Sequence, residues 1–133
     1  MPNRLEWAPR HGVGNASLDA QHQAILARCN ALADCLDAAE DRRFDETFKE
    51  LMNLAREHFA AEEALLARCG YAELDDYRSE REEFDYLADE IATTEHFDRD
   101  ELQTFLALWW AGHIRGGASN HRAFLEQKPA TSA

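Results

Sequence analysis

The sequence contains few of the residues that interrupt helices. Its 133 residues include only three prolines and six glycines, so long stretches carry no helix-breaking residue. This scarcity argues against a fold of many short strands joined by turns, and it favours helices. The length is that of one domain, and it is sufficient to bury a hydrophobic core without a disulfide or a structural metal.

Positive charge and long apolar runs are also scarce. Asp and Glu outnumber Lys and Arg by 26 to 14, which gives a net charge of −12. Such a chain repels phosphate, so we expect no nucleic-acid or anionic-membrane partner. No segment approaches the roughly 20 apolar residues of a membrane span. The opening residues, MPNRLEWAPRHG, also lack the apolar run of a signal peptide, and we expect a cytoplasmic protein.

Signals for a disulfide or zinc framework are missing too. The three cysteines, Cys29, Cys35 and Cys69, are odd in number and show no CxxC spacing. They are typical of small apolar residues in a reducing compartment.

Apolar residues recur at steps of three and four in four segments. The pattern predicts helices at 17–39, 42–69, 73–94 and 98–126, after an irregular arm at 1–16 and before a flexible tail at 127–133. Ser17 is the expected N-cap of the first helix, and Gly70 fits the position beyond the second. Asp98 and Glu101 form a capping box, and Gly116-Gly117 should weaken or kink the last helix. The sequence thus predicts an all-α, up-down-up-down four-helix bundle.

Six polar residues interrupt the apolar stripes, with at least one in each predicted helix. They are His22, His58, Glu62, Tyr77, Arg81 and His113. His58 and Glu62 stand four residues apart, so they share a helix face and can hold the same ion. Two histidines and a carboxylate suit mononuclear non-haem iron, with zinc as the competitor. A buried hydrogen-bond network without metal explains the same pattern, and spacing leaves both interpretations open.

The remaining histidines are weaker candidates. His11 lies in the arm and His96 in a link between predicted helices, so both are expected at the surface. His121 lies two turns beyond His113, past the glycine pair, and is expected to be exposed rather than to bind metal.

Three motifs together resemble the hemerythrin family, including its bacteriohemerythrins. Residues 18–22 read LDAQH, similar to the family's D-x-Q-H, and residues 58–63 read HFAAEE, similar to its H-F-x-x-E-E. Residues 109–114 read WWAGHI and resemble its W-L-x-x-H-I, with Trp110 in place of the usual leucine. The resemblance extends over about residues 5–125 and implies a four-helix bundle with a non-haem metal site.

The resemblance implies an incomplete ligand set. Oxygen carriers of the family hold two irons with five histidines and two bridging carboxylates. The matching ligands here are His22, His58, Glu62 and His113, whereas Tyr77, Arg81 and Ala118 stand where the family has two histidines and an aspartate. The resemblance also implies that the family's apolar oxygen pocket is retained more fully than its ligand set. The pocket positions correspond to Ile25, Phe59, Trp109 and Ile114.

Arg81 has two possible arrangements. If it points inward, it pairs with Glu62, and the seam is then neutral without a metal ion. An added divalent ion would leave a net buried charge, which is unfavourable. If Arg81 instead extends to solvent, Glu62 is free to bind metal.

These observations predict a binding protein rather than an enzyme. It would hold at most one non-haem iron, or zinc, and no haem, with dioxygen or nitric oxide as a possible small ligand. The first alternative is a metal-free bundle that acts as a protein-interaction module. A di-iron oxygen carrier is less well supported, because the second iron would keep only His113 and a share of Glu62.

Overall fold

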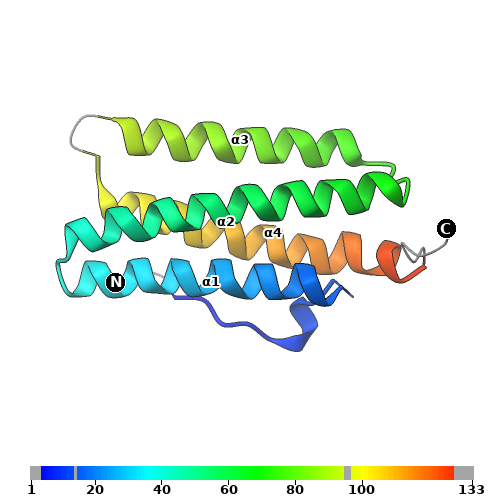
Figure 1. Ribbon diagram of the computed structural model, residues 1–133, viewed down its shortest axis with the longest axis horizontal. Coiled ribbons are helices and arrows are strands. Elements are labelled where there is room, and N and C mark those ends of the chain that lie inside the picture. The colour runs from blue at the N-terminus through cyan, green and yellow to red at the C-terminus, as the bar shows by residue number, and fades with distance from the viewer. Residues whose placement is uncertain (1–3, 14, 95–96, 128–133) are drawn as a thin grey trace.

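The computed structural model describes residues 4–13, 15–94 and 97–127. A short 3-10 turn, η1 (Pro9–His11), precedes four helices, namely α1 (Ala16–Asp37), α2 (Asp41–Arg68), α3 (Leu74–Thr93) and α4 (Arg99–Gln127). The helices lie side by side and alternate in direction, which confirms the predicted four-helix bundle (Figure 1). Each helix begins and ends within two residues of its predicted range. The predictions for His96 and for the tail beyond Gln127 lie outside the described residues.

The helix termini confirm two of the predicted end signals and correct a third. Asn15, not Ser17, caps α1, because its side chain accepts a hydrogen bond from the Leu18 N–H at 3.0 Å. At the start of α4, Asp98 accepts from the Glu101 N–H at 3.2 Å, as the capping box predicted. Gly70 follows α2 with a φ of +74°, in the left-handed region that glycine adopts without strain.

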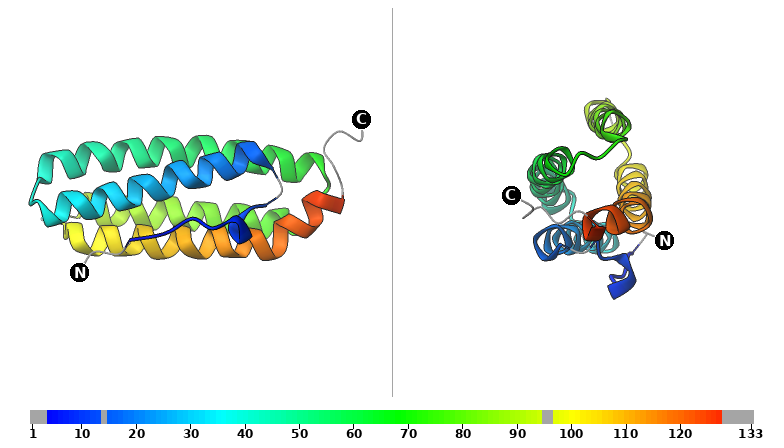
Figure 2. Two further views of the ribbon diagram at one scale, coloured as in Figure 1. Left: turned by 90° about the horizontal axis from the view of Figure 1, so that it is seen from below. Right: turned by 90° about the vertical axis from the view of Figure 1, so that its right-hand side faces the viewer.

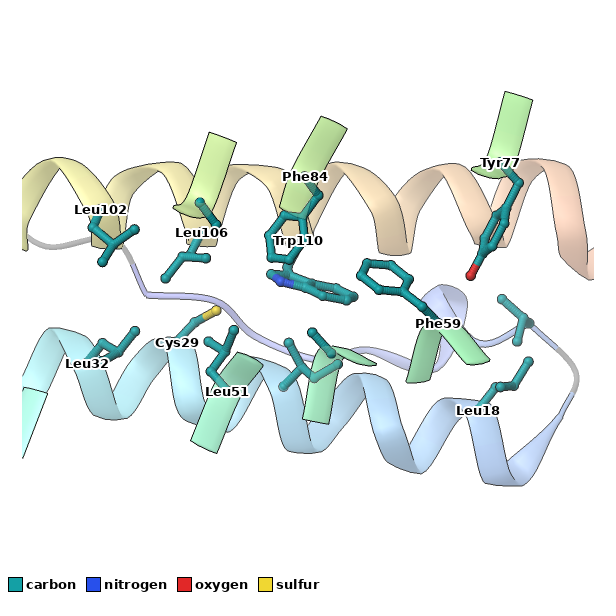
Figure 3. Close-up of a cluster of buried hydrophobic side chains, with 14 of the residues drawn as sticks. Leu18, Cys29, Leu32, Leu51, Phe59, Tyr77, Phe84, Leu102, Leu106 and Trp110 are labelled. Carbon is teal, nitrogen blue, oxygen red and sulfur yellow. The ribbon is translucent and has the colours of Figure 1, made fainter. Parts of the chain in front are cut away.

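Apolar residues spaced three and four positions apart in the helices pack into one core (Figure 3). The aromatic rings of Phe59, Phe84 and Trp110 fill its middle, and Tyr77 points its hydroxyl inward from α3 (Figure 3). Each fully buried large side chain contributes roughly 1.5–3 kcal/mol through removal of apolar surface from water. Among the described helices, none has the length and apolar character needed to cross a membrane.

The N-terminal arm is fastened along α1. Leu5 exchanges two hydrogen bonds with the Asn30 side chain, each 2.8 Å long. Just before the start of α1 in the sequence, the Val13 N–H donates to the Asp19 side chain at 2.9 Å, and Val13 itself is fully buried. The arm therefore covers one side of the bundle rather than extending away from it (Figure 2).

α3 is the most sparsely packed helix. It buries only Tyr77, Phe84 and Ala88, whereas α2 buries nine residues. Seen along the bundle, α3 stands at its outer side, across from α1 (Figure 2). The end of this helix that carries Tyr77 forms one wall of the site described next.

α4 continues through Gly116 and Gly117 without ending there. Its last turns bend from the axis of the earlier part of the helix, in line with the weakening expected from the glycine pair (Figure 2). The continuation carries His121 to the same end of the bundle as His113.

Candidate metal centre

Four buried side chains from three helices meet inside one end of the bundle. His22 comes from α1, His58 and Glu62 from α2, and His113 from α4. One ligand atom of each lies within 4.8 Å of every other, and no other group of this kind is found among the described residues. The four residues that the sequence singled out as metal ligands are therefore brought together.

The spacing of these atoms fits one shared ion. Two ligand atoms about 2.0–2.1 Å from a tetrahedral metal lie roughly 3.4 Å apart. The histidine Nε2 atoms are separated by 3.0 Å between His22 and His58 and by 3.4 Å between His58 and His113. Glu62 Oε1 lies 3.0 Å from His113 Nε2 and 3.2 Å from His58 Nε2. Only small outward movements would make room for an ion.

Gln21 fixes the orientation of the His58 ring. Its side-chain oxygen lies 2.9 Å from His58 Nδ1 and accepts the proton there. The bare Nε2 of His58 then faces the centre of the cluster, which is the tautomer that a metal ligand needs. Sequence reasoning quoted Gln21 only as part of a motif. Its position next to His22 in the sequence was the available signal. Two neighbouring residues of α1 can contact the two different nitrogens of the His58 ring on α2.

Glu62 is a buried carboxylate whose basic neighbours, among the described residues, are histidines. It is fully buried, and among the described residues no Lys or Arg contacts it. Burial alone would raise its pKa, but His113 and the histidines around it hold the pKa well below 4.5. Its Oε2 atom has no hydrogen-bond partner among the described residues. A buried negative charge of this kind is costly unless a cation compensates it, so the cluster fits a bound metal ion.

Tyr77, rather than Arg81, reaches Glu62. The Tyr77 hydroxyl donates to Glu62 Oε1 at 2.8 Å. Arg81 is 39% exposed and turns outward to Glu63, with Nη1 2.7 Å from the carboxylate. The proposed Arg81–Glu62 pair is therefore wrong, because the adjacent Glu63 lies on the outer side of α2 and offers a solvated partner. The alternative that left Glu62 free of Arg81 is the one that the structure supports.

His121 contradicts the sequence-based prediction of exposure. It is only 7% exposed, and its Nδ1 lies 3.8 Å from Glu62 Oε2. Helix geometry was the missed signal: side chains lean toward the N-terminus of their own helix, so His121 covers the preceding turn of α4. The position of Ala118 falls in that turn, although its side chain is not among those described.

Aromatic rings close one side of the cluster. The Trp109 ring stacks on His113 with centroids 5.1 Å apart, and Phe59 meets His113 edge-on at 5.9 Å. Trp110 is fully buried and lies 5.8 Å from His58. Phe59 and Trp109, two of the four residues assigned to the pocket, thus contact the His113 side of the cluster.

The two aliphatic residues of that predicted pocket are buried as well. Ile25 is fully buried, and Ile114 is 2% exposed. Ile114 also lines a separate cavity under the N-terminal arm, together with Leu26, His11 and Arg115. His11, expected at the surface, is partly buried there and accepts the Ala8 N–H at 3.1 Å.

Acid should destabilise the metal-free protein well above the pH at which carboxylates titrate. Burial, and then the neighbouring His58, lower the pKa of His22 from 6.5 to about 3. Between these two values the unfolded chain binds a proton that the folded chain does not, so stability falls as the pH falls. Glu62 acts in the same direction below 4.5, because its folded pKa is also depressed.

Urea denaturation of the metal-free protein from pH 7 to pH 4 measures this loss. We expect a decrease on the order of a few kcal/mol in the free energy of unfolding, beginning near pH 6.5. A His22→Gln variant serves as control, since its stability should change less between pH 6.5 and 4.5. Equal stability of the parent at pH 7 and pH 5 would contradict the buried, neutral state of His22.

Comparison with known proteins points to one family. Residues 13–117 match the hemerythrin HHE cation binding domain family. A hemerythrin-like protein of Naegleria gruberi is 30% identical over 125 residues, covering 94% of this chain and 97% of that protein. The bacteriohemerythrin of Stenotrophomonas maltophilia is 27% identical over 129 residues, covering 95% and 82% of the two chains.

A myohemerythrin of Riftia pachyptila is 28% identical over 116 residues, which is 87% of this chain and 89% of that one. No solved structure matches the chain with comparable significance. The similarity to these relatives extends over nearly the whole chain, so it includes every residue of the cluster.

Proposed function

The chain belongs to the hemerythrin HHE cation-binding domain family, and from this premise we propose that it binds one non-haem iron ion. His22, His58, Glu62 and His113 would hold the ion, and the bundle at 17–126 would form the binding domain. The observation that carries this proposal is the convergence of four buried ligand atoms within 4.8 Å of one another. Three imidazoles and one carboxylate suit iron, with zinc as the chemical competitor.

The surroundings of the cluster support binding of a small gas molecule. In this ligand set an iron ion would supply an open coordination position for a molecule such as dioxygen or nitric oxide. Phe59, Trp109 and Trp110 exclude bulk water from that side of the cluster. Tyr77 offers a hydroxyl donor beside Glu62. We therefore propose sensing or storage of iron or of a small gas, and no catalytic reaction.

Glu62 has no Lys or Arg partner among the described residues, and this favours a bound metal over a metal-free bundle. Arg81 and Arg78 both pair with Glu63, and neither contacts Glu62. In the metal-free protein only the surrounding histidines stabilise the Glu62 charge, and a bound metal cation would compensate it more fully.

Metal content decides between these functions. Metal-free protein loaded with Fe²⁺ without oxygen and then desalted should retain one iron per chain by elemental analysis. A parallel sample loaded with Zn²⁺ and then challenged with Fe²⁺ reports which ion the site prefers. No retained metal would favour the metal-free interaction module, and two irons per chain would favour the di-iron carrier. Either result would refute the proposal.

A further inference from the structure

His121 is a buried histidine that the four-residue cluster does not include. Its Nδ1 atom has no hydrogen-bond partner among the described residues, although the side chain is more than nine-tenths buried. Within the site, Glu62 Oε2 lies 3.8 Å from this nitrogen. A polar atom buried without a partner requires an explanation, and binding of a metal ion is one of the few that chemistry offers.

The fold holds the His121 ring against this carboxylate. The ring lies over the preceding turn of α4, where Nδ1 would be only 3.5 Å from a Cβ placed on Gly117. Tyr71 meets the ring edge-on with centroids 5.1 Å apart, and Tyr77 flanks it at 5.9 Å. These contacts leave the ring little freedom to turn toward solvent.

His121 Nδ1 and Glu62 Oε2 are too far apart for a hydrogen bond, but their separation suits two ligands of one metal ion. At 3.8 Å the nitrogen and oxygen are too far apart to share a proton. Two ligands at about 2.0–2.2 Å from one ion lie roughly 3–4 Å apart, depending on the angle between them. Glu62 Oε2 is also 3.9 Å from His22 Nε2, so the partnerless oxygen stands between two histidines.

We propose that His121 is a further protein ligand of the metal ion, on the side of Glu62 that carries Oε2. This inference rests on the proposed iron-binding function and adds a fourth histidine to its ligand set. It assigns to α4 two ligands, His113 and His121, which stand eight residues, or just over two turns, apart. A nitrogen-rich set of this kind favours Fe²⁺, Co²⁺ or Zn²⁺ over Mg²⁺ or Ca²⁺.

A cavity connects this part of the site with solvent. It has a volume of about 550 Å³ and lies between α3 and α4, with Tyr77, His113 and His121 among its lining residues. Four exposed carboxylates also line it, those of Glu73, Asp76, Glu80 and Glu83. The cavity therefore gives a cation an acidic path to His121 and Glu62, because negative walls raise the local concentration of positive ions.

Titration of the metal-free full chain with Co²⁺ and with Zn²⁺ tests the role of His121. A lost hydrogen-bonding partner of a ligand typically lowers metal affinity about 10–100-fold. A lost ligand should reach at least the upper end of that range, so we expect His121→Ala to weaken Co²⁺ binding about 100-fold or more. His11→Ala is the matched control, since His11 lies in the N-terminal arm outside the cluster, and its loss should leave the affinity unchanged.

Two further measurements separate a ligand from a structural residue. His121→Gln keeps a polar side chain of similar length, and it should fail to restore Co²⁺ affinity if an imidazole ligand is required. The visible absorption of bound Co²⁺ should also change in band position and intensity, because the coordination number changes. Urea denaturation of each metal-free variant shows whether the fold is retained.

The outcomes are distinct. Parental affinity in His121→Ala, or full rescue by His121→Gln, would overturn the assignment of His121 while leaving the proposed function intact. A parent chain that binds neither Co²⁺ nor Zn²⁺ would refute both the assignment and the proposed function. Weakened binding in His121→Ala and His121→Gln, with an altered Co²⁺ spectrum, would support the assignment.

Discussion

Replacing Glu62 with glutamine should remove metal binding and also lower the stability of the metal-free protein. Glu62 supplies the only carboxylate among the four converging residues, and its two oxygens face different histidines. An amide is a poor ligand beside a carboxylate, so we expect Co²⁺ or Fe²⁺ affinity to fall at least about 100-fold. The amide also carries no charge, and its oxygen can still accept the Tyr77 hydroxyl. The histidines around Glu62 hold its pKa well below 4.5, so the folded protein favours the charged form, and the neutral amide should lower the free energy of unfolding.

Glu63→Gln is the matched control for this prediction. It makes the same chemical change one residue along α2, where the carboxylate pairs with Arg81 and Arg78 on the outer side of the helix. Metal titration should separate the two variants, and urea denaturation reports the stability of each metal-free fold. The control should bind metal normally and lose up to about 1 kcal/mol of stability, as is usual for exposed ion pairs. Undiminished metal affinity in Glu62→Gln, or an equal loss of metal affinity in both variants, would contradict the proposed site.

Restoring three missing ligands should add a second ion. The variant combines Tyr77→His, Arg81→His and Ala118→Asp, and we expect two irons per chain with visible charge-transfer bands. Position 77 already faces Glu62, since the Tyr77 hydroxyl reaches Oε1 at 2.8 Å. Because helices hold side chains in fixed places, three substitutions can rebuild a ligand set without changing the backbone. Iron stoichiometry by elemental analysis, together with the visible spectrum, measures the outcome.

The double variant without Ala118→Asp provides the internal control. It tests α3 alone, so a gain that requires the aspartate would locate the remaining defect on α4. Partial occupancy of the second position would implicate the bend after Gly116 and Gly117, which displaces the last turns of that helix (Figure 2). A triple variant that folds and binds no more iron than the parent would refute the assignment of positions 77 and 81 to the family's two histidines.

The fold could be predicted from spacing because each helix buries one continuous stripe. In α2, Phe44, Leu51, Ala55, His58 and Glu62 follow steps of three and four and are all buried. Caps were harder to assign, because Asn15 and Ser17 are both good capping residues and lie two positions apart. Only the path of the arm decides between them: Val13 is fixed to Asp19 by a hydrogen bond, which brings Asn15 to the start of the helix.

The site was predicted less completely than the fold, and the reason lies in side-chain direction. Periodicity places a residue on a face of its helix, but it does not say how far a long side chain bends from that face. Arg81 reaches away from the seam to Glu63, and His121 reaches back along α4 into the core. Because of this side-chain flexibility, neither the Arg81–Glu63 contact nor the burial of His121 could be predicted from the sequence. His22, His58 and His113 were predictable because a seam position leaves an imidazole no other direction.

The sparse packing of α3 has a consequence for the rate at which metal can be exchanged. A helix held by only three buried side chains should open locally at a lower free energy than the whole bundle. One of the three is Tyr77, which also donates to Glu62, so each opening of this helix uncovers the carboxylate. Ion exchange would then follow the opening and closing of one helix rather than global unfolding. The protein could hold its ion tightly at equilibrium and still release it many times within the lifetime of the folded chain.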